Sequence, residues 1–153
     1  IRPFASALAA ALVLAACGGN DEPPAPPQPV PFAEVLDSAF SGVTQPRQVA
    51  VNDAEAWAAL WSEHTGNVSP APPRPAVDFS SQTVAAVFFG RSNACQRAQV
   101  TSVEAGGQAV RVHWRIVGPA AGDVCPAVVL TPVHIVRFAN PARGPVEFRQ
   151  LDQ

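Results

Sequence analysis

Three cysteines and three histidines are the side chains of this sequence that are best suited to chemistry. A cysteine thiol can act as a nucleophile when a neighbouring histidine takes its proton. In an oxidising compartment two thiols can instead join as a disulfide. The sequence around each of these residues favours one role over the others. The cysteines are Cys17, Cys95 and Cys125, and the histidines are His64, His113 and His134.

Cys17 ends an N-terminal segment with the layout of a secretory signal. Arg2 precedes an apolar run of roughly ten residues, and small residues follow it. That run is too short to cross a bilayer as a stable helix, which needs roughly 20 apolar residues. Residues 14–17, Leu-Ala-Ala-Cys, resemble the bacterial lipobox, in which the cysteine thiol receives a diacylglyceryl group and the chain is cut just before it. The alternative is an ordinary secretion signal that happens to contain a cysteine.

The lipobox resemblance implies a protein held on the bacterial cell envelope by a lipid anchor at Cys17. Gly18 and Gly19 follow the cysteine, as in lipoproteins that are released to the outer membrane. Residues 18–31 are rich in proline and have almost no apolar side chain to bury, so we expect a disordered linker. Residues 32–153 are then expected to form a single domain.

Cys95 and Cys125 remain as a pair once Cys17 is assigned to the lipid anchor. Each lies in a loop beside predicted strands, so the two could meet as a disulfide. Such a bridge would close a loop of about 30 residues, for which the chain-entropy model gives roughly 3–4 kcal/mol of stabilisation. The alternative is a free, nucleophilic Cys95 that is activated by His113 or His134.

One amphipathic helix is the clearest element that could position these residues. Asn52 could cap it, and Glu55 would complete a capping box. We expect its tryptophan face to pack on a sheet and its last histidine to be partly exposed. Residues on that face recur at i, i+3, i+4 and i+7, namely Trp57, Leu60, Trp61 and His64.

The other elements are predicted to be strands. Residues 83–90, Thr-Val-Ala-Ala-Val-Phe-Phe-Gly, fit a central strand that is buried on both faces. Residues 108–117 alternate between apolar side chains and the cations Arg111, His113 and Arg115. The cationic face could bind an anion or could simply face solvent. We expect an α+β fold with about six or seven strands in a curved, mainly antiparallel sheet, and one main helix packed on it.

The composition and motifs argue against several classes of function. A formal net charge of -2 gives no basic surface for nucleic acid. The sequence has no His-x-x-x-His pair, no Cys-x-x-Cys pair and no phosphate-binding glycine loop. After Gly90 it lacks the second glycine of a nucleophile elbow. We therefore expect no metal, no cofactor and no enzymatic activity.

Four segments together resemble a known family. They are Glu-Ala-Trp-Ala-Ala-Leu-Trp-Ser-Glu-His at 55–64, Val-Asp-Phe-Ser at 77–80, the apolar run at 83–90, and Leu-Thr-Pro-Val-His-Ile-Val at 130–136. Across roughly residues 50–138 the chain resembles the C-terminal domain of PrcB-type protease complex subunits. The resemblance implies a non-catalytic subunit that supports a surface protease. The chain departs from the family after Gly90, where many members have a Thr-Gly-Gly-Tyr-like turn.

These observations predict a lipid-anchored, non-enzymatic accessory protein that binds another envelope protein, such as a protease. The candidate interaction loop consists of Gly90, Arg91, Ser92 and Asn93. One alternative is an inhibitor-like module that presents residues 90–97 to a protease cleft. The other is a Cys-His hydrolase.

The lipid anchor gives a first prediction. Palmitate supplied in labelled form to cells that make the protein should enter the chain at Cys17, because the lipobox directs a diacylglyceryl group, whose fatty acids would carry the label, to that thiol. Mass spectrometry of the N-terminal peptide would locate the label. A mature protein without label at residue 17 would contradict the lipoprotein interpretation.

Overall fold

The computed structural model describes residues 26–93 and 95–152. The predicted signal segment, Cys17 and most of the predicted linker therefore lie outside the described residues. The described residues form one helix and ten strands, which confirms the α+β class but with more strands than expected. Among them, no helix is long and apolar enough to span a membrane.

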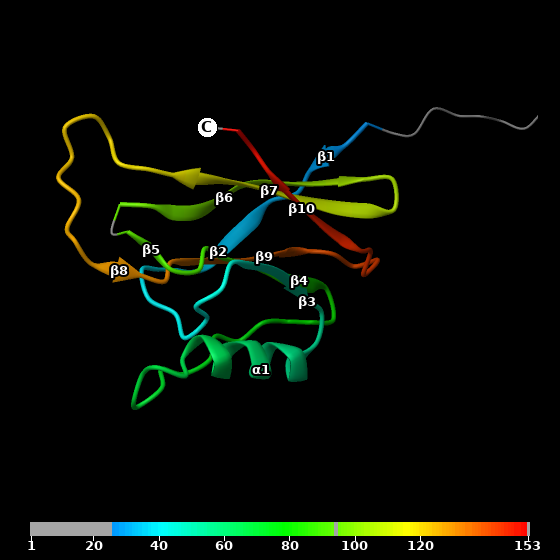
Figure 1. Ribbon diagram of the computed structural model, residues 1–153. Coiled ribbons are helices and arrows are strands. Elements are labelled where there is room, and N and C mark those ends of the chain that lie inside the picture. Colours follow the sequence, from blue (N-terminus) through cyan, green and yellow to red (C-terminus); the bar gives the residue numbers. More distant parts are fainter. Residues whose placement is uncertain (1–25, 94, 153) are drawn as a thin grey trace, which may run out of the picture.

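The strands form two sheets of four and one small ladder (Figure 1). The sheet that we call the middle sheet has the order β2 (Phe32–Ser38), β9 (Val133–Ala139), β4 (Gln82–Phe88), β3 (Arg47–Val51). The outer sheet has the order β1 (Gln28–Pro29), β6 (Arg97–Gly106), β7 (Ala109–Val117), β10 (Val146–Gln150). The ladder joins β5 (Ser92–Asn93) to β8 (Val129–Leu130). Neighbouring strands are antiparallel, except that β10 runs parallel to β7.

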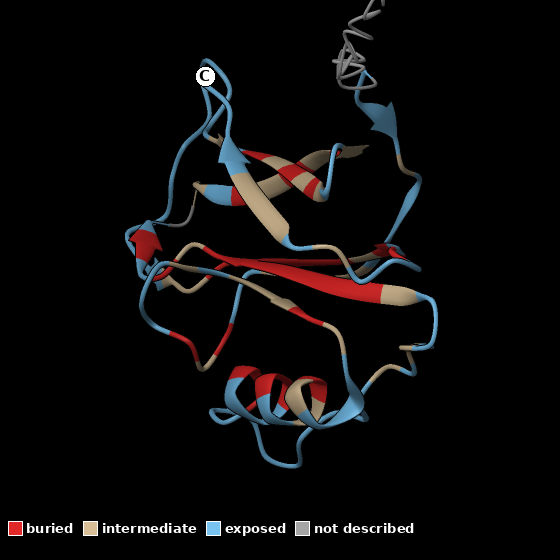
Figure 2. Cartoon of the chain, turned by 90° about the vertical axis from the view of Figure 1, so that its right-hand side faces the viewer, coloured by how far each residue is buried: buried red, intermediate tan, exposed pale blue. Residues whose placement is uncertain are grey.

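The middle sheet lies between the helix α1 (Ala54–His64) and the outer sheet, so the domain has three layers (Figure 1). The prediction of a single sheet was therefore wrong. The domain needs a second sheet because β4 is apolar on both faces, and such a strand must be covered on each side. Figure 2 shows buried residues along the middle sheet, on the helix face turned toward it and on parts of the outer-sheet strands.

β4 confirms the predicted central strand. Its side chains from Val84 to Phe88 have no exposed surface. Val84, Ala86 and Phe88 belong to the hydrophobic cluster beneath the helix, whereas Ala85 and Val87 belong to the cluster between the two sheets. Alternate side chains of this one strand thus contribute to both hydrophobic cores.

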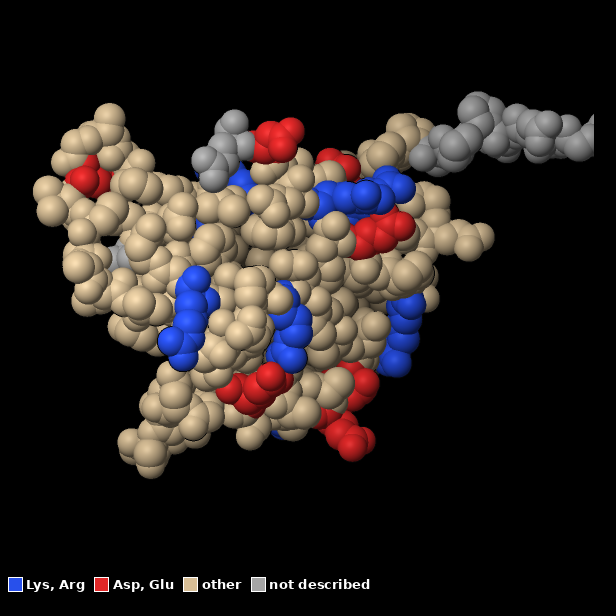
Figure 3. Space-filling model, viewed as in Figure 1, with Lys and Arg blue, Asp and Glu red and all other residues tan. Residues whose placement is uncertain are grey.

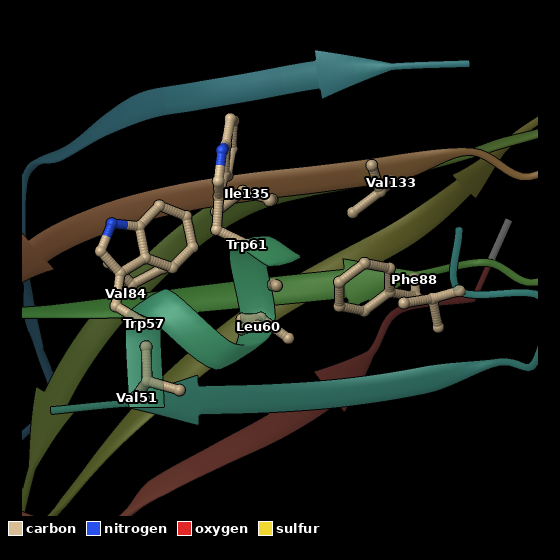
Figure 4. Packing of buried hydrophobic residues seen from close by; sticks show 10 residues of the cluster. Val51, Trp57, Leu60, Trp61, Val84, Phe88, Val133 and Ile135 are labelled. Carbon is tan, nitrogen blue, oxygen red and sulfur yellow. The ribbon is translucent and has the colours of Figure 1, made fainter. Parts of the chain in front are cut away.

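The helix packs as its periodicity predicts. Trp57, Leu60 and Trp61 are buried against Val84, Phe88 and their neighbours (Figure 4). The cap differs from the prediction, because Asp53 and not Asn52 accepts a hydrogen bond from the Ala56 amide at 2.7 Å. The Asn52 side chain is instead occupied, since its amide oxygen accepts from the Thr83 hydroxyl.

The proline-rich loop after the helix supplies acceptors for the two buried indoles. Trp57 Nε1 donates to the Pro75 carbonyl at 3.0 Å, and Trp61 Nε1 donates to the Pro72 carbonyl at 3.1 Å. A buried polar group without a partner is destabilising, so these bonds allow tryptophan on the inner face. The loop therefore completes the helix layer rather than merely connecting it to β4.

The outer sheet shows the predicted alternation along β7. Val110, Val112 and Trp114 are buried, while the cationic side chains face outward. Arg111 lies 3.3 Å from Glu147 of β10. His113 lies 3.3 Å from Glu104 of β6. Figure 3 shows arginine and acidic groups next to each other over β10. Two of the three cations thus have glutamates beside them, which disfavours the anion-site alternative.

β1 extends the domain beyond its predicted start. Gln28 and Pro29 pair with Ala105 and Glu104 of β6. The Val30 amide then donates to the Val103 carbonyl at 2.8 Å. The folded part therefore includes the last residues of the predicted linker, and the chain passes from the outer sheet into β2 of the middle sheet.

His134 joins the two sheets through a buried polar contact. Its Nδ1 accepts the Val100 amide hydrogen at 2.9 Å, across the space between β9 and β6. A nitrogen that accepts this bond carries no proton, so the proton lies on Nε2, which faces Glu34 Oε2 at 3.2 Å. Val100 lies at an irregularity in the β6–β7 register.

This contact gives a second prediction. His134→Phe should lower the free energy of unfolding by about 1–3 kcal/mol, because it leaves the buried Val100 amide without an acceptor. Urea denaturation would measure the change. The matched control is His113→Phe on the outer face, where a partly exposed contact with Glu104 contributes about 0–1 kcal/mol. Equal losses in the two variants would contradict the proposed role of His134.

Candidate functional site

The disulfide between Cys95 and Cys125 is present, as predicted, with a Cα–Cα distance of 5.6 Å. It joins the turn after β5 to the loop of residues 118–128. Every residue of that loop is exposed, so burial contributes little to its position. In Figure 1 the loop projects beside β8 at one end of the molecule. The disulfide therefore restrains the 118–128 loop, which packing against the core does not.

The bonded sulfurs bear on the Cys-His alternative. Cys95 has no free thiol in this structure, so a Cys95 nucleophile would first require reduction of the bond. Both ring nitrogens of His134 already have partners, Val100 and Glu34, and His113 lies beside Glu104 on the outer face. Within residues 26–93 and 95–152, no group of three or more His, Cys, Asp or Glu side chains is arranged to hold a metal ion.

The predicted interaction loop is more constrained than expected. Gly90 has φ +78°, and a Cβ there would lie 2.7 Å from Pro46. Ser92 and Asn93 form β5, where they pair with β8, and Ser92 is buried. Arg91 and Asn93 are the exposed members of this segment. Local sequence could not reveal the pairing, because β8 lies almost 40 residues further along the chain.

Sequence reasoning missed an exposed apolar surface beside this segment. Phe40 is 61% exposed and Val129 is 68% exposed, and Val128 is also exposed. The apolar patterns of residues 32–40 and 128–138 predict longer strands over both regions. The structure ends β2 at Ser38, and Thr131 and Pro132 separate β8 from β9. We call Phe40, Arg91, Val128 and Val129 together the Phe40–Val129 surface.

Two shallow depressions form this surface, and Arg91 and Val129 line both. The first, of about 360 Å³, also includes Val128 and the β5 residues. The second, of about 330 Å³, is bounded by Phe40 on one side and by polar residues that include Thr44, Asn67 and Thr131. The surface is therefore continuous from residue 128 to residue 40, and Arg91 lies between its two halves.

The backbone around Phe40 is held by hydrogen bonds on both sides. The Ser38 hydroxyl accepts from the Phe40 amide at 3.1 Å and donates to the Phe40 carbonyl at 3.0 Å. The Thr131 hydroxyl accepts from the Ser41 amide at 2.8 Å and donates to the Ser41 carbonyl at 2.7 Å. The Thr131 amide donates to the Ala39 carbonyl at 3.1 Å. An exposed aromatic ring is thus carried on a fixed backbone.

The same segment is tied to the C-terminal end of the helix. The Ser41 hydroxyl lies 3.1 Å from His64 Nδ1, and both side chains are buried. The Gly42 amide donates to the His64 carbonyl at 2.7 Å, and a Cβ at Gly42 would clash with the Glu63 carbonyl oxygen. The expectation that His64 is partly exposed was wrong, because residues 41–43 cover the helix end.

A larger depression, of about 450 Å³, lies on the other side of the disulfide. Its lining includes Cys95, Arg97, Asp37 and Asp123. The Asp123 carboxylate accepts from the Ala120 amide at 2.8 Å, which orders the start of the 118–128 loop. The charges in this depression are of both signs, so its lining does not select one class of ligand.

Comparisons with known proteins place the chain in no family. No family model matches it, and no curated protein and no solved structure matches it. The resemblance to PrcB-type subunits therefore stays a prediction.

His64 gives a third prediction. Burial lowers the pKa of His64 below its ordinary value of 6.5. The unfolded chain then takes up the proton at higher pH than the folded chain does. The free energy of unfolding should therefore fall as the pH drops below about 6.5 and recover as it rises.

Urea denaturation between about pH 7.5 and 5 would measure this dependence for the protein and for His64→Gln. The variant should be less stable at neutral pH and should show a weaker loss on acidification. The other two histidines are present in both proteins, so their difference isolates residue 64. Parallel pH profiles would contradict the assignment.

Proposed function

We propose that this protein is a lipid-anchored, non-enzymatic accessory protein of the bacterial cell envelope. It binds another envelope protein, such as a protease, through the Phe40–Val129 surface. The observation that carries the proposal is Phe40, whose ring is 61% exposed on a backbone fixed by five hydrogen bonds. The anchor and the envelope location rest on the lipobox resemblance at Cys17.

Energetics support a binding role for this surface. Full burial of a phenylalanine side chain contributes about 1.5–3 kcal/mol of stabilisation. In the free protein Phe40 stays exposed, so much of this stabilisation would be gained only when a partner covers the ring. Interfaces obtain most of their affinity from a few such side chains near their centre. Because the Phe40 backbone is already ordered, a partner need not offset the entropy of ordering it.

The place of the surface in the fold supports an envelope role. β1, the first described strand, and β8 lie at opposite ends of the molecule (Figure 1). A tether that enters the domain at β1 therefore leaves the Phe40–Val129 surface uncovered. A partner on the same envelope could reach that surface without displacing the anchor.

The inhibitor-like alternative finds less support in this geometry. An inhibitory loop must enter a cleft with its backbone free, whereas Ser92 of residues 90–97 is buried and paired with β8. The exposed apolar side chains lie beside that segment and not on it. A flat contact over the surface fits these positions better than insertion of the loop.

A fourth prediction tests the proposed function. Crosslinking in intact cells, followed by purification from membranes, should recover a partner with the full-length protein. Phe40→Ala should weaken that capture by about tenfold or more, since it removes the central apolar contact. Its melting temperature should stay nearly unchanged, because the ring is exposed.

The matched control is Leu151→Ala, which removes another exposed apolar side chain that follows β10. This variant should capture the partner as well as the original protein does. Recovery of no partner, or equal capture by Phe40→Ala, would overturn the proposal.

A further inference from the structure

We propose that the Phe40–Val129 surface recognises an extended polypeptide segment in which an acidic side chain pairs with Arg91 and an apolar side chain lies on either side. The inference rests on the proposed function and names the chemistry of the partner. Arg91 is the one charged residue of this surface.

Arg91 is an exposed cation without an acidic partner in the described part of the chain. Arg47 lies 2.7 Å from Glu63, and Arg111 lies 3.3 Å from Glu147. No carboxylate of the described residues lies within 4.0 Å of Arg91. A guanidinium among apolar side chains pairs well with a carboxylate, because the two form a bidentate, charge-assisted contact.

The backbone that carries Arg91 is fixed. Its amide donates to the Thr44 carbonyl at 3.2 Å. On one side Gly90 packs against Pro46, and on the other Ser92 is buried in the β5–β8 ladder. The guanidinium therefore extends from a defined point, which favours a partner with a matching charge at a defined point.

The order of features across the surface suggests the form of the ligand. One depression contains Val128, the next contains Phe40, and Arg91 and Val129 border both. An extended chain presents every second side chain on one face, about 6.5–7 Å apart. A segment with the pattern apolar-x-acidic-x-apolar would direct its acidic side chain toward the Arg91 guanidinium. Its two apolar side chains would lie over the depressions on either side.

A polypeptide fits this surface better than a lipid headgroup does. An anionic headgroup also carries oxygens that could pair with Arg91. However, anionic membrane surfaces are typically bound by clusters of several Lys or Arg side chains, whereas Arg91 is the one charged residue that lines these two depressions, so a protein partner is the occupant that we infer.

The test exchanges charges between the protein and a peptide. The probes are two labelled peptides with blocked ends, Thr-Leu-Thr-Glu-Thr-Leu-Thr and the same peptide with Lys in place of Glu. Fluorescence polarisation would measure their binding to the full-length protein. We expect the Glu peptide to bind at least about tenfold more tightly than the Lys peptide.

Arg91→Glu should reverse this preference, so that the Lys peptide binds more tightly. The matched control is Arg115→Glu, at an exposed arginine of β7 that also has no acid within 4.0 Å among the described residues. This control changes the net charge equally and should keep the original preference. Circular dichroism melting would show that both variants are folded.

Three results would overturn the inference. They are equal or absent binding of the two peptides, an equal effect of Arg115→Glu, and Arg91-dependent binding to vesicles of anionic lipid without binding to the Glu peptide. The proposed function is tested separately. If Phe40→Ala abolishes partner capture and Arg91→Glu does not, the accessory role stands and the acidic-segment inference fails.

Discussion

The burial of β4 on both faces is the constraint on which the rest of the structure depends. Five consecutive residues of this strand have no exposed surface, so the chain must supply one cover above it and another below. The helix supplies one and the outer sheet supplies the other. The helix can offer two tryptophans to this core because the proline-rich loop provides carbonyl acceptors for both indoles. His134 then joins the second cover to the middle sheet by accepting the Val100 amide hydrogen.

The disulfide matters because hydrophobic packing orders only the residues within the three layers. Residues 118–128 leave the outer sheet, are exposed and belong to neither hydrophobic cluster, so hydrophobic burial does little to fix them. A covalent link from Cys125 to the turn after β5 restricts them instead. The short β5–β8 ladder and the hydrogen bonds of Thr131 order the neighbouring chain. Polar and covalent contacts thus replace packing at this end, and its surface can stay apolar without being part of a core.

Features with a local periodic signal could be predicted from the sequence, whereas features that depend on distant partners could not. The buried strand β4, the alternation of β7 and the tryptophan face of the helix follow from spacing alone. The second sheet depends on β1 and on the parallel pairing of β10 with β7, which no local pattern encodes. Asn52 and Asp53 both have side chains suited to a helix N-cap. The Asn52 amide oxygen already accepts a hydrogen bond from the Thr83 hydroxyl, so Asp53 caps the helix. The candidate site was found in part, because the cysteine pair and Arg91 were recognised and Phe40 was assigned to a strand.

The hydrogen bonds around Phe40 order the backbone beneath an exposed ring. A solvent-exposed ring adds little to the stability of the free protein, yet the backbone on both sides of it is tied to Ser38 and Thr131. Thr131 can act in this way because Pro132 separates β8 from β9 and places a threonine between the two strands. The same break leaves Val129 exposed in a short ladder next to Arg91. One interruption of a strand therefore orders the aromatic residue, exposes the valine and places both beside a cation. Under the proposed function, a partner would meet this surface already ordered, so binding would not have to offset the entropy of ordering it.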